Sequence, residues 1–214
     1  MLKFLFEHTV AATYTIYPLS KQQWLSNMSS VVLDPGEPTE TNCNADIEAV
    51  FDYLVKDQQI TPEQIVLYGR SLGSGPSSYL ASKTALDGRS VAGLILHSPF
   101  MSVFRVAFDV GITLSLLGDK FPNIDRVAEM QCPVCIIHGR QDEVIPIAHG
   151  EALYEALPEK CKAAPFFVDN MTHNYHDFEV EVNMMKRLND YLDYHILARR
   201  LWMKKPNRKR TALV

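Results

Sequence analysis

Short apolar runs alternate with amphipathic segments along most of the chain. Each run is apolar almost throughout, as in strands covered on both faces, and the runs predict strands at 65–68, 91–96, 132–138 and 164–168. Apolar residues at helical spacing predict helices at 45–55, 76–83, 147–157 and 175–197. The first helix should bury Ile47, Val50, Phe51, Leu54 and Val55. This alternation predicts an α/β fold, with a mostly parallel sheet flanked by helices and right-handed crossovers.

The two ends of the chain differ from its middle. Residues 11–17 favour a strand that Pro18 would end. We divide the chain into a divergent N-terminal segment, a core and a basic C-terminal tail, at 1–35, 36–198 and 199–214. Within the core, residues 101–131 are too apolar for an open loop. We expect them to form a helical cover over the strand tips, where a substrate would enter.

Composition narrows the classes of function. The 214 residues fit one α/β domain, and the net charge of −4 argues against nucleic acid as a partner. Cys132 and Cys135 have the spacing of a metal or redox pair, but they enter an apolar strand and no second ligand pair accompanies them. We therefore expect these cysteines to be structural, and we expect neither a metal nor a cofactor.

The start of the chain resembles a signal peptide only weakly, because Glu7 and His8 interrupt its apolar stretch. No apolar run reaches the roughly eighteen residues that a membrane-spanning helix needs. The sequence therefore predicts no signal peptide, no membrane span and a cytoplasmic location.

Candidate chemistry begins where the first predicted strand of the core ends. Residues 69–73 are Gly-Arg-Ser-Leu-Gly, between a strand and a helix, which is the pattern of a nucleophile elbow. In so sharp a turn, Gly69 and Gly73 avoid side chains that would collide. Ser71 Oγ would stand at the strand tip, and the N-terminus of the following helix favours developing negative charge. The Leu72 N–H is the expected oxyanion donor.

A serine hydroxyl needs a base to accept its proton and a carboxylate to orient that base. Asp142 and His173 follow Ser71 in the order that this fold type uses, and each comes just after a predicted strand. The carboxyl ends of parallel strands meet at one edge of a sheet. We therefore predict Ser71 as nucleophile, Asp142 as acid and His173 as base.

Other residues remain open for these roles. His176 lies three residues after His173 and could replace it as base, and Glu143 could replace Asp142 as acid. His97 and His138 lie at strand ends beside the predicted site, where they could line or brace it. Sequence spacing alone does not choose among them.

Several segments share a more specific pattern than the elbow alone. They are 36–42, 45–49, 67–76, 94–102, 105–108, 121–125, 137–145, 149–150 and 172–174. On these residues the chain resembles the alpha/beta hydrolase domain-containing protein 17 family, the depalmitoylating group of the α/β-hydrolase fold. The resemblance implies a serine hydrolase that cleaves palmitoyl thioesters from cysteines of membrane-associated proteins, with S-palmitoylated proteins as partners. It carries the nucleophile onto Ser71, the acid onto Asp142 and the base onto His173, and it implies no cofactor.

The sequence departs from the family pattern before residue 36. The usual N-terminal strands of the α/β-hydrolase fold are expected to be lacking, and the family's membrane-directing cysteine cluster has no counterpart in 1–35. A loop after one of those strands usually supplies a second oxyanion N–H, so Leu72 is the one donor that we expect. The strand at residue 65 should expose an apolar edge unless 11–17 covers it.

The resemblance leaves three functions to compare. The first is a palmitoyl-protein thioesterase. The second is a general esterase, lipase or peptidase of the same fold, and the third is a catalytically impaired form that binds a partner. In the tail, the basic residues of 199–210 fit a solvated helix end, and with Trp202 they also fit contact with an anionic membrane surface; nuclear localisation is a third alternative. Membrane contact would place the protein peripherally, on the inner face of the plasma membrane or on endosomes.

Overall fold

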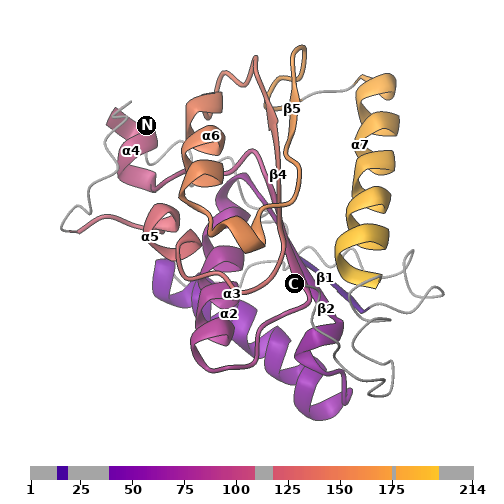
Figure 1. Cartoon of the computed structure of the whole chain (residues 1–214). Coiled ribbons are helices and arrows are strands. Elements are labelled where there is room, and N and C mark those ends of the chain that lie inside the picture. The colour runs from indigo at the N-terminus through magenta and orange to yellow at the C-terminus, as the bar shows by residue number, and fades with distance from the viewer. Residues whose placement is uncertain (1–13, 19–38, 109–117, 175–176, 198–214) are drawn as a thin grey trace, which may run out of the picture.

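The computed structural model describes residues 14–18, 39–108, 118–174 and 177–197 (Figure 1). These residues form one five-stranded sheet in the order β1-β2-β3-β4-β5. The strands are Tyr14–Pro18, Ile65–Arg70, Gly93–His97, Val134–Gly139 and Phe166–Val168. Strands β2 to β5 pair in parallel, and β1 pairs antiparallel with β2. The predicted α/β fold with a mostly parallel sheet is confirmed.

Helices connect the parallel strands. The α-helices are α2 (Glu40–Asp52), α3 (Ser74–Leu86), α4 (Val103–Phe108), α5 (Asn123–Val127), α6 (Ile147–Ala156) and α7 (Phe178–Tyr191). Short 3₁₀ turns are η2 (Pro62–Gln64), η3 (Ser71–Gly73) and η4 (Glu159–Cys161), and π-helical turns extend α2 and α7 as η1 (Tyr53–Asp57) and η5 (Leu192–Leu197). Each predicted helix is present, with ends shifted by a few residues.

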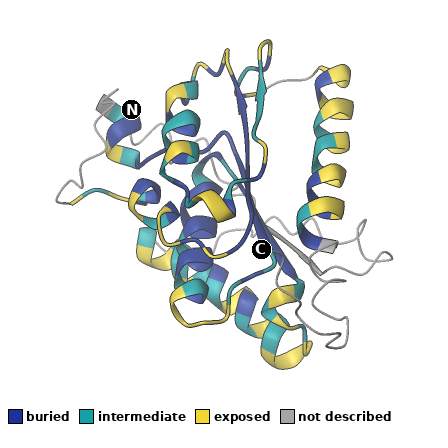
Figure 2. Cartoon of the chain, in the orientation of Figure 1, coloured by how far each residue is buried: buried dark blue, intermediate teal, exposed yellow. Residues whose placement is uncertain are grey.

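The sheet is covered on both faces, as the uninterrupted apolar strands predict. Figure 1 shows α7 on one side of the sheet and α2, α3 and α6 on the other. Alternate residues of β2 separate accordingly: Ile65 and Leu67 pack with the larger group of helices, whereas Val66 packs with α7. Figure 2 shows β3 and β4 buried along their whole length, whereas β5 is only partly buried.

Helix α2 illustrates how local sequence sets an element. The Thr39 side chain accepts the Asn42 N–H at 3.2 Å and caps the helix N-terminus. Ile47 and Phe51, four residues apart, are buried against the core. Val50 is 37 % exposed, so its prediction as a core residue is wrong. Helical periodicity gives the direction of the buried face, but its width depends on neighbouring elements.

Helix α7 is fixed at both ends. Asp177 caps its N-terminus by accepting the N–H groups of Glu179 and Val180. At the other end, the buried Tyr191 hydroxyl donates to the Pro133 carbonyl at 2.8 Å. The predicted apolar face of this helix therefore packs on the sheet, with Val180 and Tyr191 both buried.

Strand β1 covers the edge of the sheet next to β2. It pairs with β2 from Tyr14 opposite Gly69 to Pro18 opposite Ile65. The strand-favouring segment that the sequence identified therefore covers the β2 edge along these residues, which is the alternative that the sequence left open. By pairing with β2, strand β1 provides hydrogen-bond partners for backbone N–H and C=O groups along the outer edge of β2. The basic tail lies outside the described residues.

The described part of the predicted cover, 101–108 and 118–131, contains helices α4 and α5. A buried ion pair joins its two halves: Arg105 Nη1 lies 2.9 Å from Asp119 Oδ2, with side chains 0 % and 3 % exposed. The same guanidinium nitrogen donates to Ser102 Oγ, and Asp119 also accepts the N–H groups of Phe104 and Lys120. Such a network stabilises the fold only while both charges are present.

We expect Arg105→Met to lower the free energy of unfolding by about 3–5 kcal/mol, because it leaves the Asp119 carboxylate buried without its countercharge. Chemical denaturation measures this. The control is Lys56→Met, which breaks the exposed Lys56–Asp52 pair and should cost less than about 1 kcal/mol. Equal costs for the two variants would contradict the importance of burial here.

Candidate active site

Ser71 lies at the junction between strand β2 and helix α3. Its φ is 50°, in the left-handed region that a non-glycine residue rarely adopts. The turn is also tight: a Cβ on Gly69 would lie 2.5 Å from the Gly73 carbonyl oxygen. Glycine is therefore required at position 69 by close approach, whereas Gly73 itself has an ordinary helical φ of −62°. This strained strand–turn–helix geometry is the structural context that the elbow motif requires.

The three residues predicted for the site come together in one hydrogen-bonded line. Ser71 Oγ is 3.1 Å from His173 Nε2. On the other side of the ring, His173 Nδ1 is 2.8 Å from Asp142 Oδ2 and 3.1 Å from Oδ1. All three residues are buried, with 9 %, 6 % and 7 % exposure for Ser71, His173 and Asp142. This geometry allows proton transfer between the hydroxyl and the imidazole.

The Asp142 carboxylate is surrounded by donors. Its Oδ1 accepts the N–H groups of Val144 and Ile145 at 3.0 and 2.8 Å. His138 Nε2 donates to the Ile145 carbonyl at 2.8 Å and lies 3.4 Å from Asp142 Oδ2. Burial acts to raise the pKa of Asp142, but its contacts with His138, His173 and Ile145 outweigh burial and hold the pKa well below its ordinary value. The carboxylate therefore stays charged beside His173.

The acid and base loops approach each other through Gly139, the last residue of β4. A Cβ at this position would lie 1.9 Å from the carbonyl oxygen of Met171. The Gln141 N–H donates to that same carbonyl at 3.2 Å, which ties the loop carrying Asp142 to the loop carrying His173. Sequence reasoning did not identify Gly139, because the clash involves backbone far away along the chain.

The alternative residues take other places. Glu143 accepts the His173 backbone N–H rather than contacting the imidazole ring, and His176 lies outside the described residues. The His97 Nδ1 is hydrogen-bonded to the Tyr68 hydroxyl. His138 lies beside Asp142, where it braces the acid loop through Ile145.

Two further features bear on the chemistry. Leu72 lies in the first turn after Ser71, where backbone N–H groups lack intrahelical partners, so its N–H can donate to a developing oxyanion. Arg70, also missed by sequence reasoning, donates from Nη2 to the His173 carbonyl at 2.6 Å. The described ranges contain no grouping of three or more His, Cys, Asp and Glu side chains suited to a metal ion.

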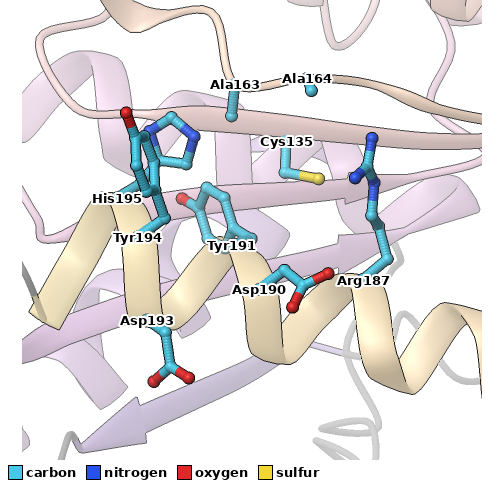
Figure 3. A pocket seen from close by; sticks show the side chains of 9 residues that line it. All are labelled: Cys135, Ala163, Ala164, Arg187, Asp190, Tyr191, Asp193, Tyr194 and His195. Atoms are coloured by element: carbon cyan, nitrogen blue, oxygen red, sulfur yellow. The ribbon is translucent and has the colours of Figure 1, made fainter.

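A separate cleft of about 620 Å³ lies between α7 and the region around β4 (Figure 3). Its lining includes Cys135, Arg187, Tyr191 and His195, and none of the three candidate residues. Burial raises the pKa of the Cys135 thiol to about 12, which makes this cysteine unreactive as a thiolate. Because Ser71, Asp142 and His173 do not line this cleft, it is distinct from the candidate active site.

Comparison with known proteins places this geometry in a family. The pattern of the prolyl oligopeptidase family matches residues 37–197. The chain belongs to the prolyl oligopeptidase family. The match includes all three candidate residues and the helices and strands that position them.

Curated relatives agree with the resemblance seen in the sequence. Over 166 residues the chain is 40% identical to the alpha/beta hydrolase domain-containing protein aho-3 of Caenorhabditis elegans, covering 78% of this chain and 47% of that protein. It is 41% identical over 162 residues to protein 17C of Xenopus tropicalis, and the match covers 75% of this chain and 49% of the relative. The predicted resemblance to the alpha/beta hydrolase domain-containing protein 17 family is confirmed. The chain spans about half the length of these relatives.

Solved structures show the same fold at low sequence identity. A sugar hydrolase of Lactococcus lactis aligns with a TM-score of 0.59 at 17% identity, covering 79% of this chain and 75% of that one. The esterase domain of a Rhodothermus marinus protein aligns with a TM-score of 0.54 at 16% identity, covering 72% and 69%. At this identity the likeness shows the fold alone. In the part of the chain that the structure describes, every helix is too short or too polar to cross a membrane.

The close packing of Gly139 against the Met171 carbonyl predicts that a side chain at position 139 destabilises the fold. Gly139→Ala should lower the free energy of unfolding by about 3 kcal/mol, the upper end of the usual cost of overpacking, because backbone must move. Gly88→Ala is the matched control, since a Cβ there meets no atom within 4 Å and only its φ of 68° is unfavourable. Denaturant unfolding measures both, and an equal loss in the two variants would contradict close packing between the loops.

His97 predicts a pH dependence of stability. Burial, followed by the positive charge of Arg70, lowers the pKa of His97 from 6.5 to about 3. As the pH falls through 6.5, the unfolded chain therefore binds a proton at His97 that the folded protein does not bind. The contribution of neutral His97 to the free energy of unfolding is complete above that pH and is lost as the pH falls toward 3. Between about pH 7 and pH 5 the loss from one such histidine is about 2 kcal/mol.

The variant His97→Gln should remove this contribution. The free energy of unfolding, measured by urea titration at each pH, should then fall less steeply between these pH values in the variant than in the unchanged protein. Parallel curves for the two proteins would show that His97 is protonated equally in the folded and unfolded states.

Proposed function

We propose that this chain is a serine hydrolase in which Ser71 attacks an acyl carbonyl, and that its substrates are palmitoyl thioesters on protein cysteines. The observation that carries the hydrolase chemistry is the Ser71–His173–Asp142 line, with distances of 3.1 and 2.8 Å. In the proposal Ser71 is nucleophile, His173 is base and Asp142 is the orienting acid. No cofactor takes part.

In the first half of the reaction, His173 Nε2 accepts the Ser71 proton while Oγ bonds to the acyl carbon. The Leu72 N–H stabilises the oxyanion, and Asp142 stabilises the imidazolium. His173 then returns the proton to the leaving thiolate, which departs as a thiol and leaves an acyl-enzyme. In the second half, His173 deprotonates a water that attacks the acyl carbon. The proton passes to Ser71 Oγ, and the fatty acid is released.

Apolar surface beside the nucleophile supports a fatty acyl substrate. Phe100, Val106, Phe121 and Ile145 form a buried apolar cluster on which Leu72 packs while remaining partly exposed. Because Leu72 directly follows Ser71, an acyl chain at the nucleophile would meet apolar side chains rather than charges. The family resemblance supplies the second argument, since it is the depalmitoylating group that the sequence resembles.

The runner-up is a general esterase, lipase or peptidase. Structural neighbours include an esterase domain, a monoacylglycerol lipase of Paleococcus ferrophilus and a puromycin-hydrolyzing peptidase of Mycobacterium tuberculosis. At such low sequence identity, these neighbours show the fold alone. The bond that is cleaved and the preferred acyl length must therefore be tested directly.

Membrane contact belongs to the same proposal. Palmitoylated proteins lie at membrane surfaces, and a basic segment at 199–210 suits an anionic lipid surface. We propose a peripheral cytoplasmic location on this basis, with S-palmitoylated proteins as partners.

The test compares one peptide carrying a palmitoyl thioester, an acetyl thioester or a palmitoyl oxyester. The proposal predicts the highest kcat/KM for the palmitoyl thioester, because acyl-chain burial adds binding energy and a thiolate leaves easily. Ser71→Ala should reduce the rate by roughly a thousandfold or more. The matched control is Ser90→Ala, which removes a hydroxyl bonded only to its neighbour's carbonyl and should leave the rate unchanged.

The outcomes separate the candidate functions. Ser71-dependent hydrolysis without preference for the long-chain thioester would favour a general esterase and reject the proposed substrate. Hydrolysis that survives Ser71→Ala would reject the mechanism. A folded protein inactive on all three substrates would favour the impaired, partner-binding form.

A further inference from the structure

Two charged side chains form hydrogen bonds with the backbone of His173, one with its carbonyl oxygen and the other with its N–H. The Arg70 Nη2 donates to its carbonyl oxygen at 2.6 Å and to Asn174 Oδ1 at 3.2 Å. The Glu143 Oε2 accepts its backbone N–H at 3.2 Å. Arg70 directly precedes Ser71, and Glu143 directly follows Asp142. Each of the two loops that meet His173 therefore supplies one candidate catalytic residue and one charged anchor.

These anchors add to the Gln141–Met171 hydrogen bond, which ties the loop that carries His173 to the loop that carries Asp142. His173 lies in the loop after β5, which is the edge strand of the sheet and only three residues long, Phe166–Val168. All three of these residues are only partly buried. A base carried by such a loop needs other contacts to keep its ring in line with Ser71, because a displacement of about 1 Å can reduce the rate by roughly a hundredfold.

We propose that Arg70 and Glu143 are positioning residues that fix the His173 main chain, so that its ring bridges Ser71 and Asp142. Arg70 links the base loop to the elbow itself, because the residue that grips His173 is adjacent to the nucleophile. Arg70 makes the stronger contact, since its donor is charged, half-buried and 2.6 Å from its acceptor. Glu143 is more exposed and makes the longer contact.

This inference rests on the proposed function, in which His173 is the base. Its test uses an activated aryl ester and a fluorophosphonate, which report Ser71 reactivity without depending on the acyl chain. The variants are Arg70→Met, Arg70→Lys, Glu143→Ala and Glu143→Gln. The matched control is Arg89→Met, because the Arg89 side chain is 55% exposed and pairs with Asp87 at the C-terminal end of α3 rather than with the loop that carries His173.

We expect Arg70→Met to lower kcat and the rate constant of fluorophosphonate labelling by roughly ten- to a hundredfold, with KM changed less than about twofold. The fraction of molecules labelled at completion should match the unchanged protein, since the residue positions the base rather than the fold. Arg70→Lys should recover part of the rate because it retains a charged donor. Glu143→Ala should cost several-fold, and Glu143→Gln, which keeps an acceptor, should cost less.

A second measurement is independent of catalysis. Hydrogen exchange of the His173 amide, followed by NMR, should accelerate in Glu143→Ala and remain slower in Glu143→Gln. Arg89→Met should change neither the exchange rate nor the labelling rate.

Two results would overturn the inference. One is an Arg70→Met protein with unchanged kcat and labelling rate. The other is a lower labelled fraction with an unchanged rate constant, which would mean that Arg70 supports folding alone. Failure of the proposed function is distinguishable, since it would appear as aryl-ester hydrolysis or labelling of the unchanged protein that Ser71→Ala does not abolish. If the unchanged protein does not react, the amide exchange alone decides whether Glu143 anchors His173.

Discussion

Parallel pairing of β2 through β5 is the constraint on which the candidate site depends. Because these strands run in one direction, their carboxyl ends lie along a single edge of the sheet. Ser71, Asp142 and His173 each follow one of those ends, so residues up to 102 positions apart are brought within hydrogen-bond distance. Neighbouring parallel strands are about 4.8 Å apart. The loops after β4 and β5 therefore have to reach across the sheet edge to bring Asp142 and His173 to Ser71. Covering helices keep the strands buried and thus keep this edge in register.

Charge at the site is organised by the same loops. A buried carboxylate is costly unless donors surround it, and Asp142 receives backbone N–H groups from its own turn as well as the His173 ring. His138 contributes to this turn by donating to the Ile145 carbonyl. Buried, fully bonded and charged, Asp142 can orient His173 without itself taking a proton. The charge on Asp142 is therefore stabilised by its own turn and by one imidazole from the preceding strand.

Much of this arrangement was predictable from sequence, for identifiable reasons. The positions of Ser71, Asp142 and His173 follow from strand and loop patterns that are local in the chain. Arg70, Gly139 and Glu143 were not assigned their contacts, because those contacts join residues up to 103 positions apart and depend on how two loops meet. Val50 was misplaced because periodicity does not report how far a neighbouring element extends. The pairing of β1 with β2 was left open, because β-propensity does not specify a partner strand.

The proposed chemistry requires that His173 and Asp142 activate Ser71 through this hydrogen-bonded line. The most direct measurement is mass-spectrometric mapping of a fluorophosphonate adduct on protein whose folding is verified by circular dichroism. We expect one adduct, on the peptide that contains Ser71, and its loss in His173→Gln. A folded protein that forms no adduct, or one that is modified elsewhere, would contradict it.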